Sequence, residues 1–187
     1  MAMPDSTGSW TVAMLDALPE DGQRYEIIDG VLYVTPAPRV RHQHVVTMLA
    51  VALAPYVTRV CRAVLLVAPT DVRKGERTSV QPDVLAVRLD ETGRVSQPVQ
   101  PSDLLLAIEV LSDRTARTDR RDKRWLYQRE GVAEYWIVDA TAWVIERWRP
   151  ADERPEILSE RIEWQCAGAR ETLAIDLPAF FAALVPD

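Results

Sequence analysis

The stretches SVQPDVLAV, at residues 79–87, and LLLAIEVLS, at residues 104–112, decide the fold of this chain. Each is an apolar run of strand length, and each carries one carboxylate near its middle, Asp83 or Glu109. A lone buried carboxylate is costly unless it is paired with a cation or binds a metal. If the two strands are adjacent, the acids converge, and a hard divalent cation would relieve their repulsion. Isolated acids at strand ends are also common, so the spacing alone leaves a structural role open.

The composition is that of one soluble globular domain, with 187 residues, of which 48% are hydrophobic and 27% charged. No apolar run is long enough to span a bilayer, and the start, MAMPDSTGSW, lacks the basic and apolar regions of a secretory signal. We therefore expect a cytoplasmic protein with no membrane contact. The net charge of −6 does not favour nucleic-acid binding by overall charge, so such binding needs a local basic patch.

The two cysteines, Cys61 and Cys166, lie far apart in the sequence and form no CxxC motif. We therefore predict two reduced thiols rather than a disulfide or a zinc site, as is usual in the cytosol.

Periodicity and turn signals predict alternating helices and strands. The dipeptide Asp29-Gly30 predicts a hairpin over 24–36. Apolar spacing predicts a helix over 41–53, bounded by Pro55. Other helices are expected over 10–19 and over 119–130, the latter capped by Thr118, and other strands over 63–72, 134–139, 142–148 and 156–164.

The order of these elements predicts an α/β (α+β) fold, in which one mixed central β-sheet is flanked by helices. The nearly continuous apolar run at 104–112 suits a central strand that is covered on both faces. The chain ends in a short strand and a helical turn that buries Phe180 and Phe181. We expect a single domain over 10–187 after a flexible arm at 1–9.

The two acidic strands resemble the PD-(D/E)XK nuclease superfamily, which has PD on one strand and ExK on a second. The match is closer to the Uma-type endonucleases, long catalogued as a domain of unknown function. It extends from about residue 9 to the C-terminus, and its most specific part is DRRDKxxxYxxxGVxEYWIVD at 119–139. The resemblance implies a restriction-endonuclease-like core and hydrolysis of phosphodiester bonds in nucleic acid, with DNA as the expected substrate. It also implies dependence on Mg²⁺ or Mn²⁺, and a homodimer.

The resemblance also implies a set of site residues. Asp83 and Glu109 match the metal-binding acids, and Glu26 matches an acid nearer the N-terminus that reaches the same metal. The backbone carbonyl of Val110 is expected to complete the metal shell. The usual lysine two residues after the second acid is replaced by Leu111, and the resemblance assigns its role to Lys123 on the following helix. Without the motif, Glu26 and Lys123 also fit solvent-facing positions.

Three further residues are expected around these acids. Gln81 shares the side of the strand that carries Asp83, because it lies two residues earlier. Tyr127 lies four residues after Lys123 and so shares its helix face. His42 matches a position where the family often has histidine. A core position for Tyr127 and a surface position for His42 remain the alternatives.

Residues 113–124 form a basic segment, with six arginines or lysines against three aspartates. The candidates for nucleic-acid binding are Arg114, Arg117, Arg120, Arg121 and Arg124, to which Arg39 and Arg41 add. Phosphate contacts there would make the affinity depend on salt. A solvated helix whose charges pair with one another is the alternative.

Three functions follow from this pattern. The first is a metal-dependent endonuclease that uses Glu26, Asp83, Glu109 and Lys123. The second is a nuclease-fold module that binds nucleic acid or regulates with little or no catalysis. The third is an oligomeric interaction protein whose acids only pair with arginines. Strands within 142–164 are a possible dimer interface.

Overall fold

The computed structural model describes residues 9–185, so the expected flexible arm lies almost entirely outside the described residues. The helices are α1 (Val12–Asp16), α2 (Val40–Arg59), α3 (Ala116–Thr118), α4 (Arg124–Arg129) and α5 (Leu177–Ala182), with a 3₁₀ helix η1 (Pro101–Asp103) and a π-helix η2 (Asp119–Lys123). The strands are β1 (Arg24–Ile28), β2 (Val31–Thr35), β3 (Ala63–Val67), β4 (Val72–Lys74), β5 (Thr78–Val80), β6 (Val84–Arg88), β7 (Leu104–Val110), β8 (Tyr135–Asp139), β9 (Val144–Trp148), β10 (Glu156–Leu158), β11 (Arg161–Trp164) and β12 (Leu173–Asp176).

A six-stranded mixed sheet forms the centre of the fold, with the strand order β10-β9-β8-β7-β6-β3. β7 and β8 are parallel, and the other neighbours are antiparallel. A second, antiparallel sheet has the order β2-β1-β5-β4, and β11 pairs with β12. The predicted α/β fold with a mixed central sheet is confirmed, and so is the pairing of the two acidic strands.

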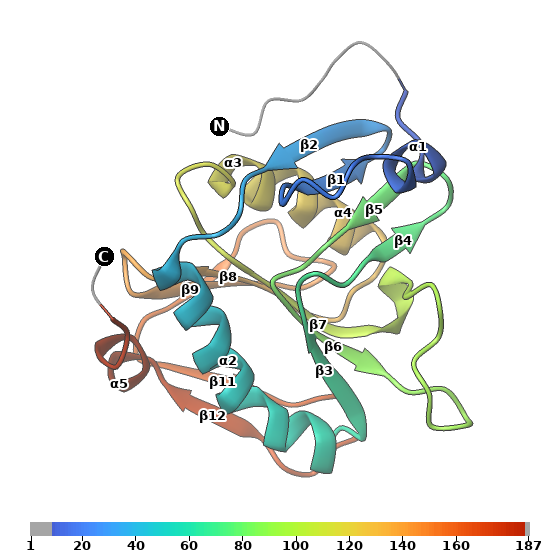
Figure 1. Cartoon of the computed structure of the whole chain (residues 1–187). Helices are drawn as coiled ribbons and strands as arrows, with labels where there is room; N and C mark the ends of the chain where they lie inside the picture. The colour runs from blue at the N-terminus through green and yellow to red at the C-terminus, as the bar shows by residue number, and fades with distance from the viewer. Residues whose placement is uncertain (1–8, 186–187) are drawn as a thin grey trace.

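Two hydrophobic cores lie on the two faces of the six-stranded sheet (Figure 1). We call them the α2 face, which α2, α5 and β11–β12 cover, and the α4 face, which α4 and the four-stranded sheet cover. Residues of β7 alternate between them: Ile108 and Val110 pack on the α2 face, and Ala107 on the α4 face. All of β7 is buried, as its apolar sequence predicts.

The hairpin of β1 and β2 is confirmed at its predicted turn. Asp29 and Gly30 both have positive φ, 51° and 85°, which is the backbone that an Asp-Gly turn provides. The hairpin attaches to the rest of the fold through β5, where Ile27 pairs with Ser79. This attachment brings Glu26 on β1 close to the residues that follow β5.

The stretch 79–87 is not one strand. It is divided between β5 in the four-stranded sheet and β6 in the six-stranded sheet, with a break at Gln81, Pro82 and Asp83. Proline has no N–H for a strand ladder, so the chain leaves one sheet there and enters the other. Asp83 therefore lies at the crossing between the two sheets. The predicted strand over 156–164 is likewise divided into β10 and β11, which pair with different partners.

Two predicted helix boundaries are wrong. Pro55 does not bound α2 but lies inside it, because Tyr56 and Val57 continue the buried face and hold the helix to Arg59. Thr118 is not a cap, since the backbone is already helical from residue 116. The C-terminal prediction is confirmed, with Phe180 and Phe181 buried in α5.

The prediction of two reduced thiols is also wrong. Cys61 and Cys166 form a disulfide, with their Cα atoms 5.9 Å apart although 105 residues separate them in the sequence. The packing of β11 and β12 against α2 brings the two loops together, which sequence distance does not reveal. The expectation of a cytosolic compartment therefore loses its support from the cysteines.

The helices within residues 9–185 include none with the length and apolar character that crossing a membrane requires.

Candidate active site

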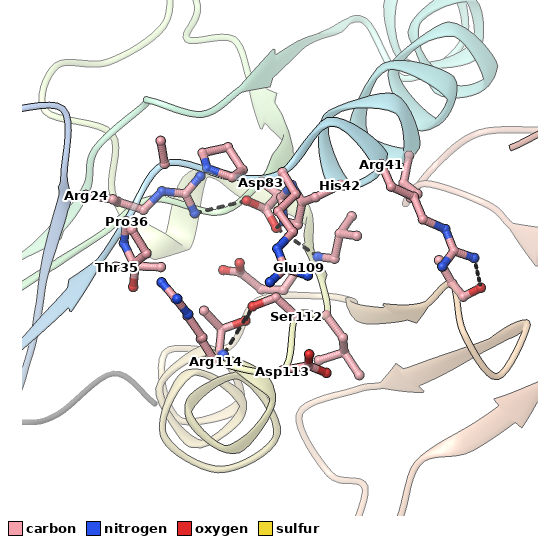
Figure 2. Close-up of a pocket in the computed structure, with 18 of the residues that line it drawn as sticks. Arg24, Thr35, Pro36, Arg41, His42, Asp83, Glu109, Ser112, Asp113 and Arg114 are labelled. Atoms are coloured by element: carbon pink, nitrogen blue, oxygen red, sulfur yellow. Dashed lines mark hydrogen bonds and ion pairs between the residues drawn. The ribbon is translucent and has the colours of Figure 1, made fainter. Parts of the chain in front are cut away.

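A cavity of about 260 Å³ opens between the start of α2, the segment that precedes it, and the end of β7. Its lining includes five ionisable residues from five parts of the chain: Arg24, His42, Asp83, Glu109 and Lys123. Figure 2 shows Asp83 between Arg24 and His42, with Glu109 beside them. The carboxylates of the two acidic strands thus meet at one cavity, as expected for adjacent strands.

Asp83 is buried, and both of its carboxylate oxygens have partners. Its Oδ2 accepts a hydrogen bond from the Val110 N–H at 2.8 Å and lies 3.0 Å from His42 Nε2, and its Oδ1 lies 3.0 Å from Arg24 Nη1. Burial opposes ionisation, but the hydrogen bond with His42 and the charge of Arg24 outweigh it and lower the pKa of Asp83 to about 2. Asp83 is therefore a carboxylate at neutral pH, as a metal ligand must be.

Lys123 bridges the other two acids. Its Nζ lies 2.8 Å from Glu26 Oε1 and 2.8 Å from Glu109 Oε1, and 4.0 Å from Asp119 Oδ1. Burial disfavours the charge on Lys123, but the carboxylates of Glu109, Glu26 and Asp119 raise its pKa well above the ordinary value. Lys123 thus stays protonated and suits charge stabilisation better than proton abstraction.

A π-turn places Lys123 inside the molecule. In η2 the Arg124 N–H donates to the Asp119 carbonyl, a step of five residues instead of four. The side chains of Asp119 and Lys123 are both buried in this turn. An isolated lysine in a helix faces solvent, and the partner carboxylates are what allow this one to be buried.

Glu109 and Glu26 complete this group of acids. Burial raises the pKa of Glu109 well above its ordinary value, and the charge of Lys123 opposes the rise. Glu26 Oε1 also accepts a hydrogen bond of 2.7 Å from the Gln81 N–H, which ties β1 to the crossing before Asp83. Burial also raises the pKa of Asp119, to about 7.

The charges of this group fit a hard divalent cation. Four buried acidic side chains, those of Glu26, Asp83, Glu109 and Asp119, face two basic side chains, Lys123 and Arg24. The excess of acidic side chains and their oxygen-only donors are what Mg²⁺ prefers. Within residues 9–185, no three acidic, histidine or cysteine side chains already form a metal-binding group. Arg24 and Lys123 hold oxygens of these acids, so a divalent ion must exchange with such contacts.

Gln81 and Tyr127 do not line the cavity. The side chain of Gln81 donates to Asp71 at 2.9 Å, so Gln81 contacts the group only through its backbone, at Glu26 and at Arg24. Tyr127 is fully buried and packs on Tyr135, with ring centroids 4.8 Å apart. Tyr127 therefore belongs to the core of the α4 face and not to the lining of the cavity.

The predicted basic candidates are divided between two places. Arg114 lines the cavity together with Arg39 and Arg41, and Arg41 points away from the carboxylates to donate to the Ala140 carbonyl at 3.0 Å (Figure 2). The other four candidates are absent from its lining: Arg117, Arg120, Arg121 and Arg124.

Two of these four arginines have partners on β9. Arg120 pairs with Glu146, at 2.6 Å, and with Asp139, at 3.4 Å. The Arg124 guanidinium lies over the ring of Trp148 at 4.8 Å. Arg121 is exposed beside Asp122, and it is Arg114 that the structure places beside the acids.

Two residues of the group escaped the sequence prediction. Arg24 lies two residues before Glu26 on β1, so the alternation of a strand was the signal that could have found it. Asp119 lies four residues before Lys123, within the motif, but its burial depends on the π-turn.

The fold and this group of buried acids with one buried lysine define a protein of the restriction-endonuclease-like class. The family described as "Uma2: Putative restriction endonuclease" matches residues 12–176, and the chain belongs to this family. The resemblance found in the sequence is thereby confirmed.

The solved structures include one with the same fold. It is described as a "putative nuclease belonging to DUF820" from Anabaena variabilis, with a TM-score of 0.71 and 20% sequence identity. The match covers 94% of this chain and 99% of that chain. No curated protein matches the chain.

Proposed function

We propose that this chain is a metal-dependent endonuclease that hydrolyses phosphodiester bonds in nucleic acid, with DNA as the expected substrate. The observation that carries the proposal is the bridge of Lys123 between Glu26 and Glu109 at the cavity that also holds Asp83. Asp83, Glu109 and Lys123 line the cavity, and Glu26 contacts Lys123 beside it, so three acids and one lysine are available for metal-dependent hydrolysis. Membership of the family supports a nucleic-acid substrate.

In the proposed reaction, Asp83, Glu109 and the Val110 carbonyl would hold Mg²⁺ or Mn²⁺, with Glu26 assisting. When bound, such an ion would lower the pKa of a water molecule and polarise the phosphoryl oxygen. The protonated Lys123 donates to the attacking water or to the negative charge that grows on the phosphorus oxygens. Glu26 and Glu109 fix the position of its ammonium group, so no reorganisation is needed when this charge develops.

Arg114 is proposed to contact the substrate backbone at the mouth of the cavity, together with Arg39. Because such contacts release counterions, binding should weaken steeply with salt. The roles predicted for Arg117, Arg120, Arg121 and Arg124 in nucleic-acid binding stay predictions, and the ion pairs of Arg120 compete with such a role. A homodimer is also proposed, and light scattering in solution tests it.

The test is cleavage of supercoiled plasmid, single-stranded DNA and RNA at low salt, with Mg²⁺, Mn²⁺ or EDTA. Wild type is compared with Glu109→Gln and Lys123→Ala, and Lys74→Ala is the matched lysine control, since Lys74 is half exposed and pairs with Glu130. We expect metal-dependent cleavage that both site variants lose by about 100-fold or more, while the control retains it. Circular dichroism checks that each variant is folded.

Each other outcome removes a defined part of the proposal. Loss in Glu109→Gln alone would keep the metal site and remove Lys123 from the reaction. Metal and nucleic-acid binding without cleavage of any substrate would identify the binding or regulatory module instead. No metal binding at all would leave the acids as partners of Arg24 and Lys123 only.

A further inference from the structure

We propose that Arg24 is a positioning residue that exchanges partners in this centre. Its guanidinium holds Asp83 while no divalent ion is bound, and it turns to the substrate phosphate once an ion takes Asp83. This inference rests on the proposed function. It gives Arg24 two roles: it neutralises Asp83 before an ion binds, and it contacts the substrate phosphate afterwards.

Arg24 contacts a carboxylate oxygen of Asp83, the acid that we propose as a metal ligand. Its Nη1 lies 3.0 Å from Asp83 Oδ1 and donates to the Gln81 carbonyl at 3.4 Å. The Arg24 side chain is 18% exposed and lines the cavity, whereas Asp83 is 3% exposed. The guanidinium therefore lies on the cavity side of the acid, where an entering ion or phosphate meets it first.

Asp83 does not need Arg24 to satisfy its hydrogen-bonding capacity. The Val110 N–H and His42 Nε2 already contact Oδ2, and Arg24 contacts the other oxygen. An ion that takes Oδ1 therefore leaves Asp83 anchored by its other oxygen. A guanidinium and a divalent cation repel each other at one oxygen, so ion binding displaces Arg24.

The displaced side chain keeps the donors that a phosphate needs. Among residues 9–185, Arg24 makes its hydrogen bonds through Nη1, which leaves the Nε and Nη2 donors for a ligand in the cavity. Arginine presents its donors in a planar fork that binds two phosphate oxygens at once. Because β1 fixes the backbone of Arg24 beside Glu26, the fork can move only within the cavity region.

The first measurement is the affinity of Mn²⁺ for the folded protein by calorimetry, which does not depend on cleavage. We expect Arg24→Gln to bind Mn²⁺ about tenfold more tightly than wild type, because the competing cation is gone. The control is Arg39→Gln, which removes the same charge from the lining of the same cavity without a contact to Asp83. Unchanged or weaker binding in Arg24→Gln, or an equal gain in Arg39→Gln, would overturn the proposal.

The second measurement is the binding of a short labelled oligonucleotide by fluorescence anisotropy, with Ca²⁺ present and with EDTA. With Ca²⁺, Arg24→Gln should lose about tenfold in oligonucleotide affinity although it binds the ion more tightly. With EDTA, the loss should be smaller, since Arg24 is then held by Asp83. A role in the fold alone would not change the two affinities in opposite directions. An oligonucleotide affinity that is unchanged with Ca²⁺ would refute the second half of the proposal.

These results are separable from those of the proposed function. A protein that cleaves nothing but shows the opposite shifts in ion and oligonucleotide affinity supports the exchange of Arg24 and refutes catalysis. A protein that cleaves but shows neither shift refutes the exchange alone.

Discussion

The two faces of the six-stranded sheet bury different chemistry. The α2 face holds an apolar and aromatic core, which includes Trp136 and Phe181, and the Cys61–Cys166 disulfide lies beside it. The α4 face also has an apolar core, but acidic and basic side chains, Glu109 and Lys123 among them, are buried next to it. Burial on the α2 face therefore stabilises the fold. On the α4 face, burial of the acidic and basic side chains costs folding free energy.

Consecutive residues of β7 connect the two faces. Ile108 and Val110 pack into the core of the α2 face, and Glu109 between them contacts Lys123. Rigid packing on one side thus fixes the carboxylate on the other, which is how an active site is held to a narrow geometry. The variants below separate the two contributions, from the largest expected effect to the smallest.

The largest effect on stability is expected for Lys123→Met. The variant removes the ammonium group that bridges Glu26 and Glu109 and leaves these buried acids without it. The free energy of unfolding should fall by about 3–5 kcal/mol in chemical denaturation without metal. Lys74→Met, at an exposed ion pair, should change it by about 1 kcal/mol or less.

A second variant shows whether the charges are the cause. Adding Glu109→Gln to Lys123→Met should restore part of the lost stability, because one uncompensated charge disappears. If the double variant is as unstable as the sum of the single variants, packing rather than charge dominates this face.

Much of this group was predictable from sequence, and the reasons are local. The apolar runs around Asp83 and Glu109 specify adjacent strands, and the family motif points to Lys123. The contacts of Arg24 and Asp119 were not predictable, because they depend on the crossing at Pro82 and on the π-turn, which no periodicity encodes. The pairing of Arg120 with Glu146 likewise depends on how a helix lies against β9.

Tertiary contacts that the sequence does not reveal also explain the two wrong predictions on the α2 face, the helix end at Pro55 and the reduced thiols. The helix continued through Pro55 because tertiary packing of Tyr56 and Val57 outweighs the local preference of proline. The disulfide was missed because 105 residues of sequence separation conceal a Cα distance of 5.9 Å. Long-range packing, rather than local propensity, decided both features.

An intermediate effect is expected for the disulfide. Replacing both Cys61 and Cys166 by serine should lower the free energy of unfolding by about 2–4 kcal/mol, because the unfolded chain is no longer cross-linked. Because the bond lies beside the core of the α2 face, the affinity for Mn²⁺ should stay unchanged in calorimetry. A large loss of Mn²⁺ affinity would show that packing on the α2 face also determines the geometry of the acids on the α4 face.

The smallest effect is a pH dependence at Asp119 on the charged side of the sheet. Burial raises the pKa of Asp119 to about 7, so the folded protein keeps a proton on Asp119 at pH values where the unfolded chain has lost it. The contribution of Asp119 to stability therefore falls as the pH rises from about 4 to about 7. Asp119→Asn cannot titrate and escapes this loss.

The stability of Asp119→Asn relative to wild type should accordingly increase by about 2 kcal/mol between pH 5 and pH 8. Urea unfolding of both proteins at the two pH values, in EDTA, measures the difference. Parallel pH profiles would mean that Asp119 is ionised in the folded protein at both pH values. The charge of Lys123, 4.0 Å away, would then stabilise the Asp119 carboxylate strongly enough to offset its burial.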